Sequence, residues 1–541
     1  MIRRPPAALS KKEMSMKPPI RTAYIRNLSL GGILRTALVL VLMSGVVSTA
    51  IAADDVQRIE PQESKKQLKL AKKLYRKGQV AEAERILRRV IATDPTFDEA
   101  KLDLSYLLLR KKRLIEAYNY AYDVANRDKE NSYAFALLGA IYLSAGNFRD
   151  ARTLLTNAIA IDNDEALAWA GLGMLDFYEN RIDESLLNLR EAVYKDSREA
   201  DFAFALAQVS ARAERYKEAA EAYQKYLRIA PDNDHERTER IRGLIRFLNF
   251  LGKRPSLYDL EGSSSTTVPV RLVNNRPVIQ IKLKESENPL NFVLDTGSGI
   301  TVISNDTAAR LKIKPVTRGG VARALGGSGK FDIVYGFIKS VGIGDVKVKN
   351  VPVYIRKFHG ASEEIDGYIG LSLISKYVTT IDYGGRTFSL IRKDDYKEVQ
   401  QPEEAMTVPL RLTSSGFLSG QVQLHGIEVP LNFIVDTGAS MSVISEDLAS
   451  STEISGFQQD ERLRVVGAAG VTEDVPSFLL PSVTFGKFSR SDLKAIALDL
   501  DLINETSGFE QSGILGGNFL MNYSLTFDFK QAKVTFIPNT K

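Results

Sequence analysis

Two aspartates, Asp295 and Asp436, occupy the same place in a stretch that the chain contains twice. Residues 290–304 read LNFVLDTGSGITVIS and residues 431–445 read LNFIVDTGASMSVIS, with nine of the fifteen positions identical. In each copy, apolar residues that favour β structure lead into a tight Asp-Thr-Gly turn. We therefore expect each carboxyl at the edge of a core, and two such carboxyls indicate a pair suited to acid/base chemistry.

The segments around these turns also occur twice and in the same order. Apolar and polar residues alternate with the period of a β-strand from residue 268 onward, and each copy has a glycine-rich hairpin, an apolar-apolar-Gly turn and a closing pair of strands. Residues 268–395 and 405–541 are therefore predicted to be two copies of one all-β domain. The glycines concerned are Gly326 and Gly327 in the first hairpin, Gly467 and Gly470 in the second, and Gly370 and Gly516 in the turns.

This order of landmarks resembles the retropepsin-like aspartic proteases, whose fold is shared by retroviral proteases and by each lobe of pepsin-like enzymes. The resemblance implies two barrel-like lobes in a pepsin-like bilobed unit, with Asp295 and Asp436 as the catalytic dyad. It implies hydrolysis of peptide bonds by a water that the dyad activates, without metal or cofactor. Pairing of the copies within one chain is favoured because covalent linkage gives them a high effective concentration, but pairing between two chains is also open.

The resemblance also assigns supporting roles around the dyad. Thr296 and Thr437 are expected to bond across to the facing loop, and Gly297 and Gly438 to let backbone amides approach the carboxyls. Ser298 is expected to donate to the outer oxygen of its aspartate, which Ala439 cannot do. Gly326, Gly327, Gly467 and Gly470 would belong to flaps that close over substrate, and Gly370 and Gly516 would form the floor beneath the loops. One departure is Gly299, where serine or alanine is more usual.

The N-terminal half repeats every 34 residues. A small residue recurs at this spacing, and aromatic and glycine positions recur around it, which resembles the tetratricopeptide pattern of paired antiparallel helices. We predict a solenoid over residues 63–253, made of five repeats and a capping helix, and a linker over 254–267. The recurring small residues are Ala83, Ala117, Ala151, Ser185 and Ala219.

Such an array offers a concave surface for a protein or peptide, and Tyr75, Arg110 and Tyr142 are candidates for lining it. A spacer or brace for the following domains is the alternative. The expected partners are therefore a protein or peptide substrate and a protein docked on the array.

Residues 1–53 have the composition of an export signal. Eight basic residues and one acidic residue accompany an apolar run over 36–47 and an Ala-Ile-Ala cleavage pattern at 50–52. We expect a periplasmic or other extracytoplasmic protein, with the leader either cleaved or kept as an inner-membrane anchor, which would be the chain's membrane contact. The leader accounts for the formal charge of +6, so the remainder does not indicate nucleic-acid binding.

Other chemistries fit less well. The chain has no cysteine and three widely separated histidines, which argues against thiol catalysis, a zinc peptidase and a histidine-assisted triad. Two alternatives to an exported aspartic endopeptidase are open. In one, the aspartates only cap turns; in the other, the protease fold and the helical groove bind peptides without cleaving them.

Overall fold

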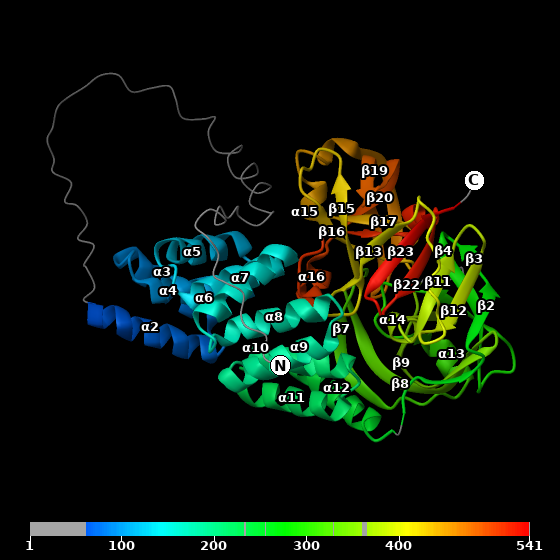
Figure 1. Ribbon diagram of the computed structural model, residues 1–541, viewed down its shortest axis with the longest axis horizontal. Coiled ribbons are helices and arrows are strands. Elements are labelled where there is room, and N and C mark those ends of the chain that lie inside the picture. Colours follow the sequence, from blue (N-terminus) through cyan, green and yellow to red (C-terminus); the bar gives the residue numbers. More distant parts are fainter. Residues whose placement is uncertain (1–60, 232–233, 255, 328, 360–364, 540–541) are drawn as a thin grey trace. The chain divides into compact units, whose positions relative to one another are not determined.

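The computed structural model describes residues 61–231, 234–254, 256–327, 329–359 and 365–539 (Figure 1). The predicted leader at 1–53 lies outside these residues. By their internal contacts, the described residues of 1–172, 194–196 and 230–233 form one compact unit, and the described residues of 173–193, 197–229 and 234–541 form another. Within the described residues, every helix is too short or too polar to cross a membrane.

The first unit consists of antiparallel helix pairs. Small residues bring the paired helices together: a Cβ on Gly139 would lie 2.6 Å from the Cγ of Leu155. The tyrosine proposed for the groove, Tyr142, is only 3% exposed and packs edge-on against Tyr118, so it belongs to the core instead. The helices are α2 (Pro61–Arg76), α3 (Val80–Thr93), α4 (Asp98–Arg110), α5 (Leu114–Arg127), α6 (Ser132–Ser144), α7 (Phe148–Ile161) and the first part of α8 (Ala166–Tyr178).

The second unit begins with the rest of the helices and continues into the β structure. Its helices are the end of α8, α9 (Ile182–Lys195), α10 (Ala200–Arg212), α11 (Tyr216–Ile229) and α12 (His235–Leu251). The contact boundary therefore falls inside the repeat array and not at its end. In both units, the small residue at the 34-residue spacing is fully buried: Ala83, Ala117, Ala151, Ser185 and Ala219 are each 0% exposed.

The segment predicted as a linker contains two strands, β1 (Asp259–Gly262) and β2 (Ser265–Pro269). β1 pairs with β9 (Val346–Arg356), and β2 pairs with β12 (Thr387–Arg392). Only residues 263 and 264 connect these strands. The linker prediction is wrong here, because local composition gives no sign of backbone pairing with strands far along the chain.

The first lobe (described residues of 256–395) is built on a nine-stranded sheet. Its order is β1-β9-β6-β10-β5-β4-β8-β7, and β3 pairs with β4. The short helices α13 (Asn305–Arg310) and α14 (Leu371–Ile374) follow β6 and β10. The other strands are β3 (Arg271–Val273), β4 (Arg276–Leu283), β5 (Leu290–Leu294), β6 (Val302–Ser304), β7 (Thr317–Arg323), β8 (Lys330–Ile343) and β10 (Gly367–Ile369).

The second lobe (described residues of 405–539) repeats this plan in an eight-stranded sheet. Its order is β14-β15-β16-β21-β17-β20-β19-β18. The strands are β14 (Arg411–Leu412), β15 (Leu418–Leu424), β16 (Leu431–Val435), β17 (Ser442–Ser445), β18 (Gln458–Gly467), β19 (Gly470–Phe485), β20 (Phe488–Leu498) and β21 (Gly513–Leu515). The helices are α15 (Glu446–Ala449), α16 (Asp501–Ser507) and α17 (Gly517–Leu520), with a 3-10 turn at Ser455–Phe457.

A third, six-stranded sheet joins the lobes. Its order is β13-β23-β22-β11-β12-β2, so strands of both copies form one continuous ladder. The joint is the antiparallel pairing of β11 (Tyr377–Asp382) with β22 (Tyr523–Asp528), and β13 (Met406–Pro409) and β23 (Lys533–Pro538) complete the second half. The predicted class, a helical tetratricopeptide region followed by two β-rich domains, is confirmed.

Candidate active site

Each Asp-Thr-Gly turn is held at the end of a strand by the strand beside it. β10 lies between β5 and β6, parallel to one and antiparallel to the other, and β21 has the same relation to β16 and β17. The amide of Asp295 donates to the carbonyl of Ile369, and the amide of Asp436 donates to that of Leu515, both at 3.0 Å. The same local topology therefore places both aspartates.

Two threonines lock the turns to each other. Thr296 and Thr437 are both 0% exposed. The Thr296 hydroxyl donates to the Val435 carbonyl at 2.7 Å and accepts from the Thr437 amide at 3.0 Å. The Thr437 hydroxyl donates to the Leu294 carbonyl at 2.7 Å and accepts from the Thr296 amide at 3.2 Å. This reciprocal exchange fixes the distance between the loops that carry the aspartates.

The carboxyls of Asp295 and Asp436 face each other across the following glycines. A Cβ on Gly297 would lie 2.4 Å from the Cγ of Asp436, and a Cβ on Gly438 would lie 2.6 Å from an oxygen of Asp295. The amides of Gly297 and Gly438 donate to the carboxyls of their own turns at 2.9 and 2.7 Å. Only glycine leaves room for this crossed packing.

The two carboxyls affect each other's pKa. Burial raises the pKa of Asp295 well above its ordinary value, and the charge of Asp436 raises it further. Burial also raises the pKa of Asp436, against the lowering effect of the Gly438 amide and of a hydrogen bond from Asp295. Both residues remain partly exposed, so solvent reaches them. Such a pair holds one proton over a range of pH and titrates as a unit.

The glycines proposed as a floor pack closely against the residues that follow the turns. A Cβ on Gly370 would approach the Ile300 carbonyl to 2.6 Å, and one on Gly516 would approach the Met441 carbonyl to 2.4 Å. The departure at Gly299 also has a steric reason: a Cβ there would lie 2.5 Å from the carbonyl of Ser415 in the other lobe. The lobes therefore meet too closely at this point for a side chain.

The role expected of Ser298 is wrong. Its hydroxyl donates to the Ile300 carbonyl at 2.8 Å, which stabilises the turn itself. In the second copy, the backbone amide of Ala439 lowers the pKa of Asp436, so an amide supplies the donor that its side chain cannot. The motif contains no sign of this difference, because the turn conformation decides where a short side chain points.

The glycine-rich tips of the two hairpins touch each other. A Cβ on Gly326 would lie 2.4 Å from the Gly470 carbonyl and 3.0 Å from the Gly467 Cα, and one on Gly327 would lie 2.8 Å from the Gly470 Cα. The Ala469 amide donates to the Leu325 carbonyl at 2.9 Å. Each lobe therefore contributes one hairpin to this contact.

The first hairpin is backed by α12. Gly243 of α12 lies so close to β7 that a Cβ there would be 2.3 Å from the Gly319 Cα. Arg240 donates to the Val321 carbonyl at 3.1 Å, and Arg246 donates to the Arg318 carbonyl at 3.0 Å. The ring of Phe247 stacks on Tyr335 at 4.4 Å. The last helix of the array thus forms part of the support of this hairpin.

Sequence reasoning missed Arg356, at the end of β9. Its guanidinium attracts the Asp295 carboxylate and lowers the pKa of that group, opposing the effect of burial. No motif marks this residue, because β9 carries no signature and reaches the site only through its pairing with β6. Among the residues that the structure describes, no group of three or more acidic or histidine side chains could hold a metal ion.

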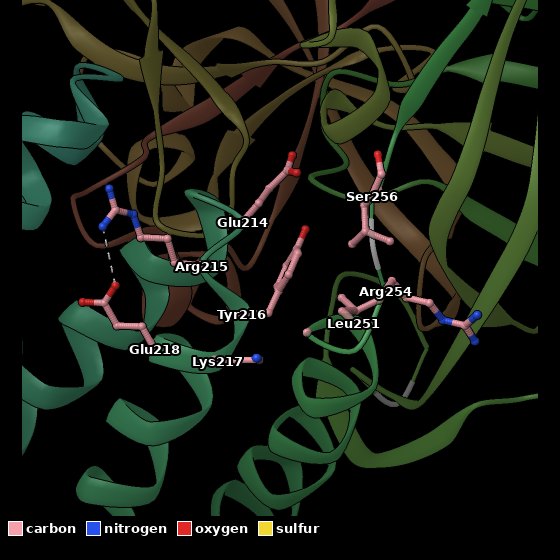
Figure 2. A pocket seen from close by; sticks show the side chains of 10 residues that line it. Glu214, Arg215, Tyr216, Lys217, Glu218, Leu251, Arg254 and Ser256 are labelled. Carbon is pink, nitrogen blue, oxygen red and sulfur yellow. Dashed lines mark ion pairs between the residues drawn. The ribbon is translucent and has the colours of Figure 1, made fainter.

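A separate hollow of about 520 Å³ opens beside the start of α11 and the end of α12 (Figure 2). Figure 2 shows Arg215 and Glu218 paired on one side of it. The guanidinium nitrogen and carboxylate oxygen of this pair are 4.0 Å apart. Its lining, which includes Tyr216, Arg254 and Ser256, holds neither aspartate. It is therefore not the carboxylate site.

Comparisons with known proteins agree with the division of the chain. The aspartyl protease family model matches residues 279–373 and 420–519, and tetratricopeptide repeat models match 74–141 and 171–234. No curated protein matches the chain.

Several solved structures are similar to part of the chain. A thermophilic TPR protein of Thermus thermophilus is 19% identical, with 35% of this chain and 99% of that chain covered and a TM-score of 0.30. PilF of Pseudomonas aeruginosa is 13% identical, with 36% and 85% covered and a TM-score of 0.27. MamA of Desulfovibrio magneticus is 20% identical, with 31% and 94% covered and a TM-score of 0.23. The β domains of this chain are therefore similar to the aspartyl protease family over the residues that its model matches, and they follow segments that match tetratricopeptide repeats.

Proposed function

We propose that the protein is an aspartic endopeptidase whose dyad is Asp295 and Asp436. The observation that carries this proposal is the crossed packing of the two carboxyls on Gly297 and Gly438, locked by the threonine exchange. Turn capping alone needs neither a second carboxyl nor a bond between the turns. The raised pKa of Asp295 agrees, because a shared proton requires one carboxyl that resists ionisation.

The reaction follows from a pair that holds one proton. The ionised carboxyl removes a proton from a water between the two groups, and the water oxygen attacks the peptide carbonyl. The protonated carboxyl gives its proton to the carbonyl oxygen, so the tetrahedral intermediate carries no net new charge. The carboxyl that took the proton from water then gives it to the amide nitrogen, while the other carboxyl takes a proton from a hydroxyl of the intermediate. The C–N bond breaks to give an amine and a carboxylic acid, and the pair again holds one proton. Gly297 and Gly438 contribute by holding the carboxyls with their amides.

The two hairpin tips supply the closure that such a reaction needs. Because they bond at Ala469 and Leu325, substrate entry requires their separation, and their return excludes water from the dyad. A substrate must therefore be an extended chain that fits beneath both tips. This favours an unfolded or flexible protein segment.

The decisive experiment uses Asp295→Asn, Asp436→Asn and a mixture of the two on an unfolded protein substrate from acid to neutral pH. Each single variant is expected to lose activity by roughly a thousandfold or more. Full activity in both variants would overturn the dyad. Recovery on mixing would place the dyad between chains. Binding of peptide by an inactive wild-type protein would support the non-catalytic alternative.

The repeat array is proposed to dock a protein substrate or partner. On α4, Arg110 is exposed and lies 5.8 Å from the ring of Tyr75 on α2, a pair that could recognise a peptide. Arg110→Ala is expected to raise the KM for a docked protein substrate while leaving cleavage of a short peptide unchanged. Equal effects on both substrates would contradict docking at this place.

Export is proposed from the leader alone. A fusion of residues 1–60 to a reporter that folds only outside the cytoplasm should be active. The matched control replaces apolar residues of 36–47 with polar ones, and this fusion should lose the activity of the reporter. An inactive parent fusion would contradict export.

A further inference from the structure

The walls beside the two aspartates occupy equivalent positions but differ in chemistry. In the first lobe, β10 and β9 place Tyr368 and Tyr354 on either side of Val302. In the second lobe, the equivalent strands place Ile514 and Ile496 on either side of Val443. Two residues further along each strand, Arg356 lies opposite Ser304 in the first lobe and Leu498 lies opposite Ser445 in the second.

The wall of the second lobe is apolar and mostly aliphatic, with Phe417 as an aromatic member. Its buried core of Ile434, Val443, Ile496 and Ile514 is continuous with the Asp-Thr-Gly turn through Ala439. Residues from both hairpins pack against the same cluster, which therefore extends from the dyad to the closure. These contributors are Leu325 from the first hairpin and Leu463 and Val465 from the second, together with Met441, Leu498 and Ile503.

The wall of the first lobe holds a guanidinium among rings. The Arg356 Cζ lies 5.6 Å from the ring centre of Phe331, 5.7 Å from that of Phe358 and 6.0 Å from that of Tyr368. Tyr368 meets Phe358 edge-on at 5.1 Å and is hydrogen-bonded by Arg276. We call Arg276, Phe331, Arg356, Phe358 and Tyr368 the basic-aromatic cluster.

The place of this cluster in the site follows from its members. Tyr368 precedes Ile369, whose carbonyl holds the Asp295 amide, so it lies beside the dyad. Phe331 is on β8, directly after the glycine-rich tip of the first hairpin. The cluster therefore runs from the dyad to the closure, as the aliphatic wall does on the other side.

Arg356 is poised for a further anionic partner. Among the described residues, no carboxylate is in ion-pair contact with it, and its Nε atom is buried without a hydrogen-bond partner. Asp295 attracts the Arg356 guanidinium electrostatically, but the two groups make no ion pair among the described contacts. A guanidinium that is partly removed from water and surrounded by rings gains most from a carboxylate that meets it in bidentate geometry.

We infer that the cleft selects substrates with a carboxylate side chain, glutamate or aspartate, on the first-lobe side of the scissile bond and an aliphatic side chain on the other. This inference rests on the proposed protease function. Arg356 is the specificity-determining residue, and the rings of Phe331, Phe358 and Tyr368 hold its guanidinium in place. Leu498, at the equivalent position of the second lobe, makes that side apolar.

The test compares peptides that differ only by glutamate or glutamine beside the cleavage point. Wild type is expected to prefer the glutamate peptide by about 10- to 100-fold in kcat/KM, the range of a charged hydrogen-bonded contact. Arg356→Leu is expected to abolish this preference, and Arg356→Lys to retain part of it. Leu498→Arg is expected to create a preference for glutamate on the opposite side.

The controls separate specificity from other effects. Lys357→Leu removes the same charge at the next, exposed position and should leave the glutamate preference intact. Each variant is assayed at its own optimum pH, because the charge of Arg356 also acts on Asp295. Thermal melting checks that the Arg356 variants fold. If Arg356→Leu does not fold, the glutamate preference is measured in Arg356→Lys instead.

Three outcomes decide the inference. Equal cleavage of both peptides by wild type overturns the specificity while leaving the protease function standing. Equal slowing of both peptides by Arg356→Leu, with a shifted pH profile, would reduce Arg356 to a residue that tunes the dyad. Absence of cleavage of any unfolded protein by wild type would instead contradict the proposed function itself.

Discussion

The two lobes are the same at their turns and different at their walls and hairpins. Both present an Asp-Thr-Gly turn with equivalent amide, threonine and glycine contacts. The first hairpin, however, packs on α12, whereas most of β18 in the second hairpin is exposed. The two turns, which contact each other directly, therefore have the same geometry. The walls and hairpins contact different neighbours in each lobe, and they differ.

The equivalence of the turns predicts equal and large effects on activity. Gly297→Ala and Gly438→Ala each put a methyl within 2.6 Å of the opposite carboxyl. Displacement of the carboxyls by about 1 Å is expected to reduce kcat/KM by about 100-fold in each variant. Gly456→Ala is the control, because a Cβ there has no neighbour within 4 Å. A strongly unequal pair of losses would show that the copies are not equivalent in the reaction.

The threonine exchange predicts a shared loss of stability. Thr296→Val and Thr437→Val each leave a buried carbonyl and amide without a partner, at a cost of about 1–3 kcal/mol per group. Denaturant unfolding should show that the double variant loses less than the sum of the singles, because all four bonds hold one junction and its loosening by the first substitution weakens the bonds of the other threonine. Serine variants keep the hydroxyl and should lose less. Full additivity would mean that the threonines act separately.

The difference between the hairpins predicts a one-sided response to α12. Gly243→Ala would favour an isolated helix by about 1 kcal/mol, yet the added methyl collides with Gly319. A net loss of about 1–3 kcal/mol is therefore expected. Amides of β7 should exchange hydrogen faster, and those of β18 should be unaffected. Asn249→Ala, at an exposed position of the same helix, is the control. Equal acceleration in both hairpins would contradict the assigned support.

The smallest expected effect is on thermal stability. The pKa of Asp295 is raised in the folded state, so its contribution to stability is present below the unfolded pKa and is lost as the pH rises through the folded value. Asparagine has no charge to bury, so Asp295→Asn should melt higher than wild type at alkaline pH, by about 2–4 °C. The difference should vanish in acid. An equal difference in melting temperature at acid and alkaline pH would show that the difference does not come from ionisation of Asp295.

Much of the fold was predictable from the sequence because the patterns are local or repeated. The 34-residue period marks helix pairs whose small residues are buried, and the duplicated turns mark two β domains. The strands β1 and β2 were missed because their partners, β9 and β12, are far along the chain.

The candidate site was only partly predictable for a related reason. Threonines and glycines that follow each aspartate are part of the motif, whereas Arg356 comes near Asp295 only through strand pairing. The support of the first hairpin by α12 is likewise a contact between a helix of the repeat array and strands of a β domain. Neither sequence pattern predicts such a contact. The orientation of Ser298 depends on the turn, which the motif alone does not define.

The ladder that joins the lobes also sets the order in which activity could arise during synthesis. Residues 379–382 of β11 pair with residues 524–527 of β22, so this pairing waits until nearly the whole chain has been made. Pairing across so long a loop is slow compared with formation of the helices. Under the proposed function, a nascent chain that lacks β22 contains both carboxyls but not the ladder that joins their lobes. Proteolytic activity is then delayed until the last strands have joined the first lobe.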